Sequence, residues 1–490
     1  MADKTINKRL KVLFVASEVR PYSISGGLGD VAGSLPRALK AQDVDIRVVF
    51  PKYGNIPIRN LADAKYIGFL TTHLSWREQG ASIYTIEPKN PEDVQLYMIE
   101  NDYYFGRDGY YGYGDDFERF SFFTKVSIEF LTKVGFQPDI IHFNDWQTGI
   151  GCTYLRDIYR GFTFYENMKS LFTIHNLRYQ GSFGREILWS IGLNDGYFTG
   201  GDLEFYNNVS LLKAGVIHSD AVSTVSDTYA KEIQTPAFGY GMEGLLRKRG
   251  EHDGRLFGIV NGIDMNLNDP KTDKRIFANF GASNVLEKKK ENKRSLQATI
   301  GLPQNDVPMV AIISRLANQK GFDIISVCLD EILSKDLQFV VLGTGEGRYE
   351  ELFKNYSYRY PDKLSAQITF NDQLAQQIYA SADIFLMPSI YEPCGLGQMF
   401  AMRYGAVPVV RKTGGLADTV KHFGPNALDG NGFMFEDFVA SALMWALNQA
   451  LSYYNTPHWD MIVQNAMAGD FSWDKSALAY VDLYEFLKNS

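Results

Sequence analysis

The chain has 490 residues and a formal net charge of −8 at neutral pH. This length exceeds that of an ordinary single domain, so two or three domains are expected, and a hydrophobic content of 45% is enough to fill their cores. The acidic balance argues against wholesale binding to nucleic acid or to an anionic membrane. Any anionic ligand must therefore be held by a local pocket.

The cysteines and the N-terminal segment give no sign of secretion or of a membrane anchor. Cys152, Cys328 and Cys394 are too few and too scattered for a disulfide framework or a zinc site. Residues 1–10 are polar and lack the apolar core of a signal peptide. No apolar run approaches the ~18 residues that cross a bilayer. The sequence therefore predicts a soluble, reduced, cytoplasmic protein.

Short apolar runs rich in β-branched and aromatic residues recur between segments with helical patterns. In the first half they cover 11–17, 45–51, 81–87, 94–100, 139–145, 170–176 and 221–226. In the second half they cover 308–314, 337–343, 365–370, 383–389, 407–411 and 432–436. Continuous apolar strands between helices are typical of parallel sheets covered on both faces. The two series therefore predict two doubly wound α/β domains.

A turn-rich stretch at 257–266 lies between the two series and marks a boundary. We place an N-terminal Rossmann-like domain at 1–258 and a C-terminal one at 259–468. The last segment, 469–490, has a helical pattern after a break at 468–474. We expect this tail to pack back on the N-terminal domain.

Glycine-rich loops follow strands in both halves, and ligands of open parallel sheets bind at the carboxyl ends of the strands. The loop SISGGLGD at 23–30 can offer backbone N–H groups and a helix start to an anion. The alternative is a tight turn between a strand and a helix. A near repeat, KTGGLAD, stands at 412–418. Such features at strand ends of both domains indicate a cleft between the domains.

Four charged or titratable residues near strand ends suit sugar-phosphate chemistry. Arg315 and Lys320 can supply a planar fork and a mobile point charge to a diphosphate. Glu392 can bind sugar hydroxyls or stabilise positive charge at an anomeric carbon. His175 ends the strand at 170–176. The alternatives are two surface cations, a carboxylate that caps a turn, and a strand-end histidine with satisfied hydrogen bonds.

No metal-dependent or nucleoside-triphosphate chemistry is expected. Asp43 and Asp45 match a D-x-D pattern, but they immediately precede a strand and indicate a polar strand entry. No other cluster of His, Cys or carboxylates has the spacing of metal ligands. The sequence also lacks a Walker loop and a G-x-S-x-G nucleophile elbow.

Taken in order, the motifs resemble those of the bacterial glycogen synthase and plant starch synthase family. The resemblance runs from about residue 11 to about 487, and its motifs are highly specific in combination. The matching stretches are KVLFVASEVRPYSISGGLGDVAGSLPRAL, IIHFNDWQTG, LFTIHNLRYQG, LLKAGVIHSDAVSTVSDTYAKEI, IVNGID, ISRLANQKGFD, ASADIFLMPSIYEPCGLGQMFAM, VRKTGGLADTV and DFSWDKSALAYVDLY.

The resemblance implies a GT-B fold, in which two Rossmann-like domains face each other across a cleft. It also implies transfer of glucose from a nucleotide sugar, ADP-glucose by preference, to the non-reducing end of an α-1,4-glucan. The anomeric configuration is retained, and neither a metal nor another cofactor takes part. The implied partners are the nucleotide-glucose donor and a glucan or maltooligosaccharide acceptor, with no nucleic acid and no membrane.

Carried over by position, the family's residues fall on the candidates above. Arg315 and Lys320 match the pair that binds the donor diphosphate, Glu392 the residue that supports the donor glucose, and His175 the histidine near the donor sugar. The substrate-binding matches are Gly26, Gly27 and Asp30 in the donor loop, Asp145 as an acidic cleft residue, Asn261 as a hinge-side contact, Phe370 as the aromatic on adenine (usually a tyrosine), and Cys394, Gly395, Leu396 and Gly397 of EPCGLGQ.

Three positions depart from the family pattern. The usual lysine of K-x-G-G-L is Ile24, the histidine often found after D-W is Gln147, and a usual D-R pair is Gly106-Arg107. Ile24 removes a charged contact worth roughly 1.5–3 kcal/mol near the donor. This predicts a slower enzyme, altered donor binding, or a paralog with a changed role.

Two rival functions remain open on the sequence. One is a catalytically weakened, glucan-binding or initiation-assisting paralog of the same fold. The other is a different two-domain sugar enzyme. A glycogen-type phosphorylase needs a pyridoxal-binding lysine motif and a longer chain, and an epimerase is not expected to carry both glycine loops with EPCGLGQ.

Overall fold

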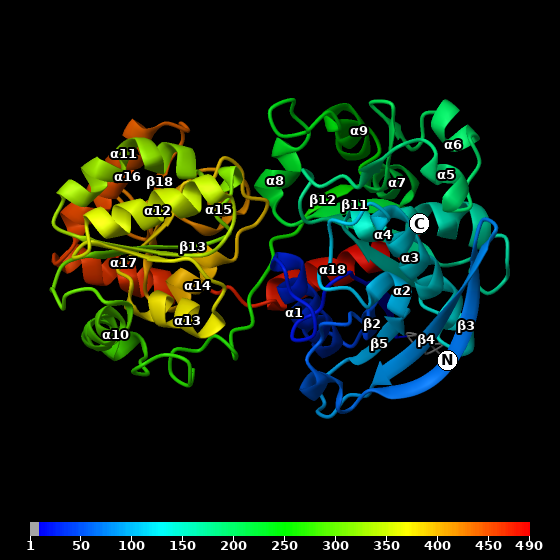
Figure 1. Ribbon diagram of the computed structural model, residues 1–490, viewed down its shortest axis with the longest axis horizontal. Coiled ribbons are helices and arrows are strands. Elements are labelled where there is room, and N and C mark those ends of the chain that lie inside the picture. The colour runs from blue at the N-terminus through cyan, green and yellow to red at the C-terminus, as the bar shows by residue number, and fades with distance from the viewer. Residues whose placement is uncertain (1–8) are drawn as a thin grey trace, which may run out of the picture. The chain divides into compact units, whose positions relative to one another are not determined.

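The computed structural model describes residues 9–490, which divide into two compact units (Figure 1). Unit 1 comprises the described residues up to Gly262 together with Trp473–Ser490, and unit 2 comprises Ile263–Ser472. None of the helices in the described part of the chain is both long and apolar enough to cross a membrane.

Unit 1 is built on a nine-stranded sheet with the order β12-β11-β7-β6-β1-β2-β5-β4-β3. Its strands are β1 (Lys11–Val15), β2 (Asp45–Pro51), β3 (Lys65–Leu74), β4 (Arg77–Ile86), β5 (Gln95–Glu100), β6 (Ile140–Asn144), β7 (Lys169–Ile174), β11 (Ala221–Thr224) and β12 (Leu256–Gly258). From β12 to β5 all neighbours are parallel, as the apolar runs predict.

The edge formed by β3 and β4 differs from the predicted parallel series. β4 pairs antiparallel with both β3 and β5, so the run at 81–87 does not belong to the parallel part of the sheet. Only Ser75 and Trp76 connect β3 to β4, and such a short link makes a hairpin, because a parallel crossover needs a dozen or more residues. β3 itself is largely exposed, which explains why it lacks a continuous apolar run.

Helices cover both faces of the unit 1 sheet. The helices are α1 (Gly27–Ala41), α2 (Asp102–Phe105), α3 (Asp116–Lys133), α4 (Trp146–Tyr154), α5 (Ile187–Ser190), α6 (Gly196–Thr199), α7 (Leu211–His218), α8 (Asp227–Glu232), α9 (Glu243–Arg247) and α18 (Asp474–Lys488). Helices α1 and α18 pack together on one face, and α3, α4 and α7 cover the other (Figure 1). A small antiparallel sheet, β8-β10-β9, forms from Ser182–Phe183, Asn208–Ser210 and Glu204–Phe205.

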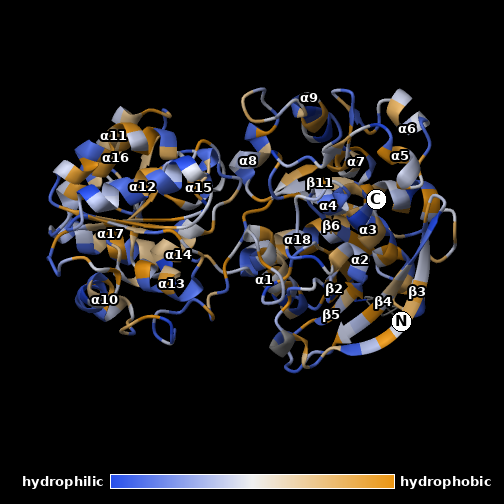
Figure 2. Cartoon of the chain, viewed as in Figure 1, coloured by the Kyte–Doolittle hydropathy of each residue, from blue (hydrophilic) through white to orange (hydrophobic). Residues whose placement is uncertain are grey.

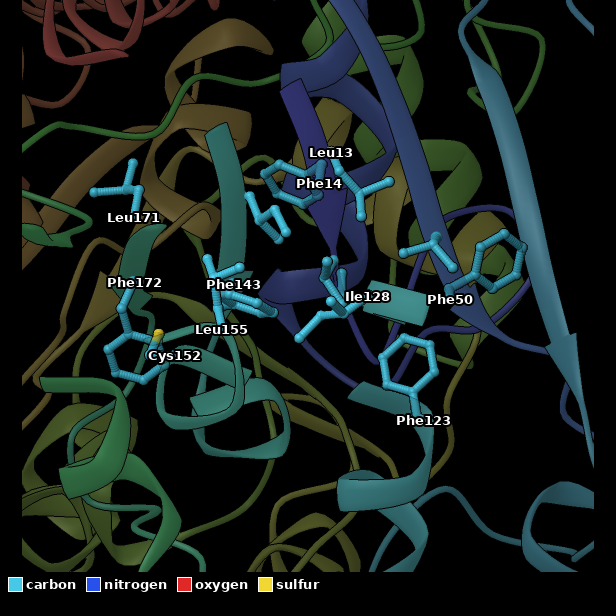
Figure 3. Packing of buried hydrophobic residues seen from close by; sticks show 14 of the residues in the cluster. Leu13, Phe14, Phe50, Phe123, Ile128, Phe143, Cys152, Leu155, Leu171 and Phe172 are labelled. Atoms are coloured by element: carbon cyan, nitrogen blue, oxygen red, sulfur yellow. The ribbon is translucent and has the colours of Figure 1, made fainter. Parts of the chain in front are cut away.

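The core of unit 1 lies between the sheet and these helices. Phe143 on β6 faces the layer of α3 and α4, where Figure 3 labels Phe123 and Ile128 of α3, whereas Phe14 on β1 points to the opposite face and meets the ring of His142. All of these side chains are fully buried. Close packing of this kind fixes the ends of β1 and β6, where candidate residues lie.

Helix α18 is attached to the sheet by a buried polar chain as well as by apolar contacts. Tyr484 on α18 makes a 2.7 Å hydrogen bond to Nδ1 of His142 on β6. Nε2 of His142 lies 2.6 Å from Oγ1 of Thr173, which in turn lies 2.6 Å from Oγ of Ser223. This series of hydrogen bonds thus links α18 to the three adjacent strands β6, β7 and β11. Burial holds the pKa of His142 well below its ordinary value, so the imidazole is neutral.

Unit 2 contains a fully parallel six-stranded sheet with the order β15-β14-β13-β16-β17-β18. Its strands are β13 (Met309–Ile313), β14 (Gln338–Leu342), β15 (Leu364–Gln367), β16 (Ile384–Met387), β17 (Val407–Arg411) and β18 (Phe433–Phe435). Its helices are α10 (Val285–Ile300), α11 (Phe322–Ser334), α12 (Gly347–Arg359), α13 (Asp372–Ser381), α14 (Gly397–Arg403), α15 (Gly414–Thr419), α16 (Ala440–Tyr453) and α17 (Pro457–Met467). Figure 2 shows hydrophobic strands between helices whose outer surfaces carry hydrophilic residues.

Candidate functional site

The candidate residues of unit 2 follow four of the six strands of one parallel sheet. Arg315 and Lys320 follow β13, Phe370 follows β15, Glu392 follows β16, and the glycine loop at 413–415 follows β17. Because the carboxyl ends of parallel strands share one edge, these residues lie along that edge of the sheet.

A salt bridge joins two of the predicted catalytic residues. Nζ of Lys320 lies 2.7 Å from Oε2 of Glu392, and the two side chains are 18% and 8% exposed. Ser389 Oγ donates a second hydrogen bond of 2.9 Å to the same carboxylate oxygen. The pair therefore places a cation and an anion side by side in a largely desolvated position, where each charge acts strongly on a ligand.

Close backbone contacts hold the Lys320 turn against the Glu392 loop. Ile390 N donates to Gln319 O at 2.8 Å, and the Gln319 side chain donates to Tyr391 O at 3.2 Å. Gly321 has φ +80°, and a Cβ there would lie 2.0 Å from the carbonyl oxygen of Pro388. Only glycine fits this approach, so Gly321 fixes the position of Lys320.

The KTGGLAD repeat serves packing in unit 2. Gly415 N donates to the carbonyl oxygens of Glu392 and Pro393 at 3.1 and 3.2 Å. A Cβ on Gly414 would lie 1.9 Å from Glu392 O, and one on Gly415 would lie 2.2 Å from Cys394 O. The glycine pair therefore lets this loop lie directly against the Glu392 loop. Lys412 forms an exposed salt bridge of 2.7 Å with Glu436.

The remaining candidates of unit 2 differ in exposure. Cys394 is buried, while Gly395, with φ +74°, and Leu396 and Gly397 are half-buried at the start of α14. The Gln398 amide donates to Cys394 O and Gly395 O at 3.2 and 2.9 Å and holds this loop in shape. Arg315 is exposed on the turn after β13.

Phe370 lies three residues beyond the end of β15 and not within a strand. The sequence predicts a strand over 365–370, whereas β15 ends at Gln367. The Phe370 side chain is 75% exposed. Its ring is therefore available to stack on a flat ligand.

In unit 1, Asp145 and His175 meet at the ends of β6 and β7. The carboxylate of Asp145 accepts hydrogen bonds from the backbone N–H groups of His175, at 2.7 Å, and Asn176, at 3.3 Å. Burial raises the pKa of Asp145 to about 7, although both backbone donors oppose the shift. Asp145 also has φ +58°, a left-handed conformation that aspartate tolerates better than most residues.

The protonation and tautomer of His175 follow from its partner. Burial lowers the pKa of His175 to about 3, so the ring is neutral at physiological pH. The Asn144 amide nitrogen donates to two carbonyls, at 3.1 and 3.2 Å, so its oxygen is the acceptor of the 2.9 Å bond with His175 Nε2. Nε2 therefore carries the proton, and Nδ1 is left as a hydrogen-bond acceptor.

The glycine loop of unit 1 is already bound by an internal carboxylate. Glu18, which is buried, accepts hydrogen bonds from Ser25 N, Ser25 Oγ (2.6 Å), Gly26 N (3.3 Å) and Tyr111 Oη (2.5 Å). The N–H groups of Ser25 and Gly26 that the sequence offers to an anionic ligand thus have an anion from the protein itself. Ser25, Gly26 and Gly27 remain exposed on their outer side.

The other candidates in unit 1 have different surroundings. Asp30 forms a salt bridge of 2.6 Å with Arg20. Ile24 is half-buried. Asn261 is buried, and within residues 9–490 its Oδ1 finds no hydrogen-bond partner. Within the same residues, Oε1 of Gln147 also finds no hydrogen-bond partner.

Comparison with known proteins decides the family. Residues 11–248 match the model of the starch synthase catalytic domain, and residues 293–466 match that of glycosyl transferases group 1. The chain is 48% identical to a glycogen synthase of Desulforamulus reducens over 98% of this chain and 99% of that protein. It is 45% identical to one of Clostridium novyi over 97% and 98%. The chain belongs to the glycogen and starch synthase family. It is a glycosyltransferase of glycogen or starch synthesis.

Solved structures agree with this family and with its fold. The catalytic domain of starch synthase IV from Arabidopsis thaliana, bound to ADP and acarbose, superposes with a TM-score of 0.91 at 32% identity, covering 98% of this chain and all of that one. A sucrose-phosphate synthase of Thermosynechococcus elongatus, at 18% identity and a TM-score of 0.62, shares the fold alone. The two Rossmann-like units therefore form a GT-B-like fold, as predicted. The cleft shared by the domains stays a prediction.

Three residues of the synthase site escaped the sequence analysis. Glu18, Tyr111 and Asn144 were not among the candidates. Glu18 and Asn144 hydrogen-bond candidate residues directly, and Tyr111 donates to Glu18. Asn144 had a usable signal, because it is the last residue of β6 and precedes Asp145. Tyr111 and Glu18 are 93 positions apart in the sequence, so no local sequence pattern predicts their contact.

Proposed function

We propose that this synthase transfers glucose from ADP-glucose to the non-reducing end of an α-1,4-glucan with retention of the anomeric configuration and without a metal. Support for the nucleotide comes from the Arabidopsis relative, whose structure holds ADP. Support for the sugar polymer comes from the glycogen synthases that match the chain over nearly its whole length.

The salt bridge between Lys320 and Glu392 is the observation that carries the proposal. Glucosyl transfer builds negative charge on the departing diphosphate and positive charge at the anomeric carbon. A cation and an anion 2.7 Å apart at the ligand-binding edge of a parallel sheet match both charges. In this proposal Lys320 and Arg315 bind the diphosphate, and Glu392 orients the glucose and stabilises its oxocarbenium-like state. Phe370 stacks on the adenine.

His175 has a matching role in unit 1. A neutral imidazole with Nδ1 as acceptor can take a hydrogen bond from a sugar hydroxyl group. Asp145 holds the backbone of His175 and so fixes the ring position. The unsatisfied amide oxygen of Asn261 can accept from another hydroxyl, since a buried acceptor without a partner is costly.

Chain extension provides the test. Purified protein is incubated with ADP-glucose or UDP-glucose and maltoheptaose, and the products are separated by length. We expect extension with ADP-glucose and a much lower rate with UDP-glucose. Failure of both donors, with measurable glucan binding, overturns the enzymatic proposal. Extension that is faster with UDP-glucose overturns the donor assignment alone.

A second candidate function has a specific observation in its favour. Ile24 supplies no cation to the donor loop, and Glu18 already binds two of the loop's N–H groups. A glucan-binding or initiation-assisting paralog with weakened catalysis fits these two features. It predicts glucan binding equal to that of active relatives together with little incorporation of labelled glucose.

A further inference from the structure

The hairpin between β9 and β10 carries an aromatic ring at a strained and exposed position. Its two-residue turn, Tyr206-Asn207, has φ values of +50° and +62°. Positive φ at both central residues defines a type I′ turn, which favours Asn and Gly and disfavours bulky side chains. Tyr206 is nevertheless 73% exposed. Neither turn preference nor burial explains a tyrosine here, and strained residues cluster where ligands bind.

A second loop supports the same ring. Tyr240 has φ +49° and Gly241 has φ +84°, and Tyr240 is 38% exposed. A Cβ placed on Gly241 would lie 2.8 Å from Cε2 and Oη of Tyr206, so the bare Gly241 backbone lies against the Tyr206 ring. The ring also meets Phe205 edge to face, with 4.7 Å between centroids, and the same Cβ on Gly241 would lie 3.1 Å from Cζ of Phe205. The Tyr206 ring is thus held in one orientation although it faces solvent.

These two loops connect to the segment that carries His175. The Gln180 side chain donates to Tyr240 O at 3.2 Å, and Ser210 Oγ donates to Gln180 O at 3.1 Å. Gln180 therefore joins both loops to the stretch that begins at His175. The aromatic surface and the histidine belong to one hydrogen-bonded part of unit 1.

The chemistry of this surface favours a neutral, flat-faced ligand. The charged side chains at this hairpin form hydrogen bonds with the protein's own backbone. Glu204 accepts from Asn207 N at 2.8 Å, and Lys213 Nζ donates to the carbonyl oxygens of Gly201 and Glu204. Tyr206 and Tyr240 are both exposed on this surface, and a tyrosine ring has an apolar face with a polar edge. A pyranose ring has this pattern, with C–H groups on its face and hydroxyls around its rim.

We infer that Tyr206 and Tyr240 form a stacking platform for the α-1,4-glucan acceptor. The inference rests on the proposed function, because that function supplies the polymer. The platform binds sugar units of the acceptor chain and takes no part in the bond that forms. The fixed ring is prepared for stacking, which lowers the conformational entropy lost on binding.

Glucan binding by the full-length protein tests the platform. Tyr206→Asn removes the ring and installs a residue that the type I′ turn prefers, so the fold is kept. We expect its Kd for maltoheptaose, measured by calorimetry, to rise about tenfold, the scale of one aromatic stacking contact. The midpoint of urea unfolding should rise or stay equal, and the Kd for ADP-glucose should not change. Trp189→Ala, at another exposed aromatic (67%), is the matched control and should bind as the wild type does.

The outcomes separate this inference from the proposed function. If Tyr206→Asn binds maltoheptaose as tightly as the wild type, the platform is refuted while the proposed function stands. If the wild type itself binds no glucan, both are refuted. Weaker binding of the sugar with unchanged binding of the donor supports the platform, because a merely structural role would alter both.

Discussion

The Lys320–Glu392 salt bridge should contribute far more to the stability of unit 2 than an exposed pair of the same length. At 2.7 Å and an effective dielectric constant of about 20, two unit charges attract by about 6 kcal/mol. Desolvation of both ions offsets much of this attraction. We therefore expect a net coupling in the range of a charged hydrogen bond, about 1.5–3 kcal/mol.

A double-mutant cycle measures this coupling directly. Lys320→Met, Glu392→Gln and the double variant are unfolded in urea, and pulsed hydrogen exchange with mass spectrometry follows peptides from β13 and β16. The free energy of unfolding of each variant gives the interaction energy of the pair. Following these peptides restricts the measurement to the unit that holds the pair.

The chain offers a matched control in Lys412 and Glu436. This pair also has a 2.7 Å separation, but its side chains are 51% and 74% exposed. Water and salt screen exposed pairs, so a second cycle, with Lys412→Met and Glu436→Gln, should give a clearly smaller coupling than the first. Equal couplings in the two cycles would refute the argument that burial strengthens the Lys320–Glu392 interaction.

Three further predictions concern unit 1. Ile24→Lys should raise donor affinity or turnover about tenfold in a chain-extension assay, since a lysine here would give the proposed donor loop a charged contact; an unchanged rate would mean that another residue supplies this contact. Asp145 has a pKa of about 7 in the folded state against an ordinary value of 3.8. Between these two pH values the folded state therefore keeps a proton that the unfolded state has lost, and the free energy of unfolding falls as pH rises. Relative to Asp145→Asn, the free energy of unfolding of the wild type, measured by urea titration, should fall by up to about 1.4 kcal/mol per pH unit between about pH 4 and 7. If the two proteins show the same dependence on pH, the raised pKa of the buried carboxyl is contradicted. Tyr484→Phe should lower the free energy of unfolding by about 1–3 kcal/mol, because it leaves buried Nδ1 of His142 without a partner, whereas a loss below 0.5 kcal/mol would show that this bond is replaced.

Buried elements of the fold follow from the sequence, while its exposed edge does not. The apolar runs at 45–51 and 407–411 coincide with β2 and β17, because strands buried on both faces need continuous apolar residues. β3 could not be found in this way, since its side chains are mostly exposed and its pairing with β4 depends on a short turn. A hydrophobic pattern in the sequence indicates which residues are buried. It does not reveal an edge strand such as β3, which is held mainly by backbone hydrogen bonds.

The candidate site divides along similar lines. The strand-end rule brings Lys320 and Glu392 to one edge of a sheet, and the structure joins them in a salt bridge. The state of the unit 1 loop was not predictable, because Glu18 reaches it only after the chain folds back over residues 18–26. A glycine motif shows that backbone N–H groups are accessible, but it does not show which acceptor they bind.

The position of α18 has a consequence for how the protein is made. Unit 1 needs residues 473–490 to cover β6 and β7, yet the 210 residues of unit 2, Ile263–Ser472, are synthesised in between. During translation the ribosome therefore delivers unit 2 complete while the face around His142 still lacks Tyr484. Unit 1 must therefore wait in a partly uncovered state while unit 2 is synthesised. A nascent chain stalled before residue 473 should accordingly be a preferred client of chaperones that bind apolar surface.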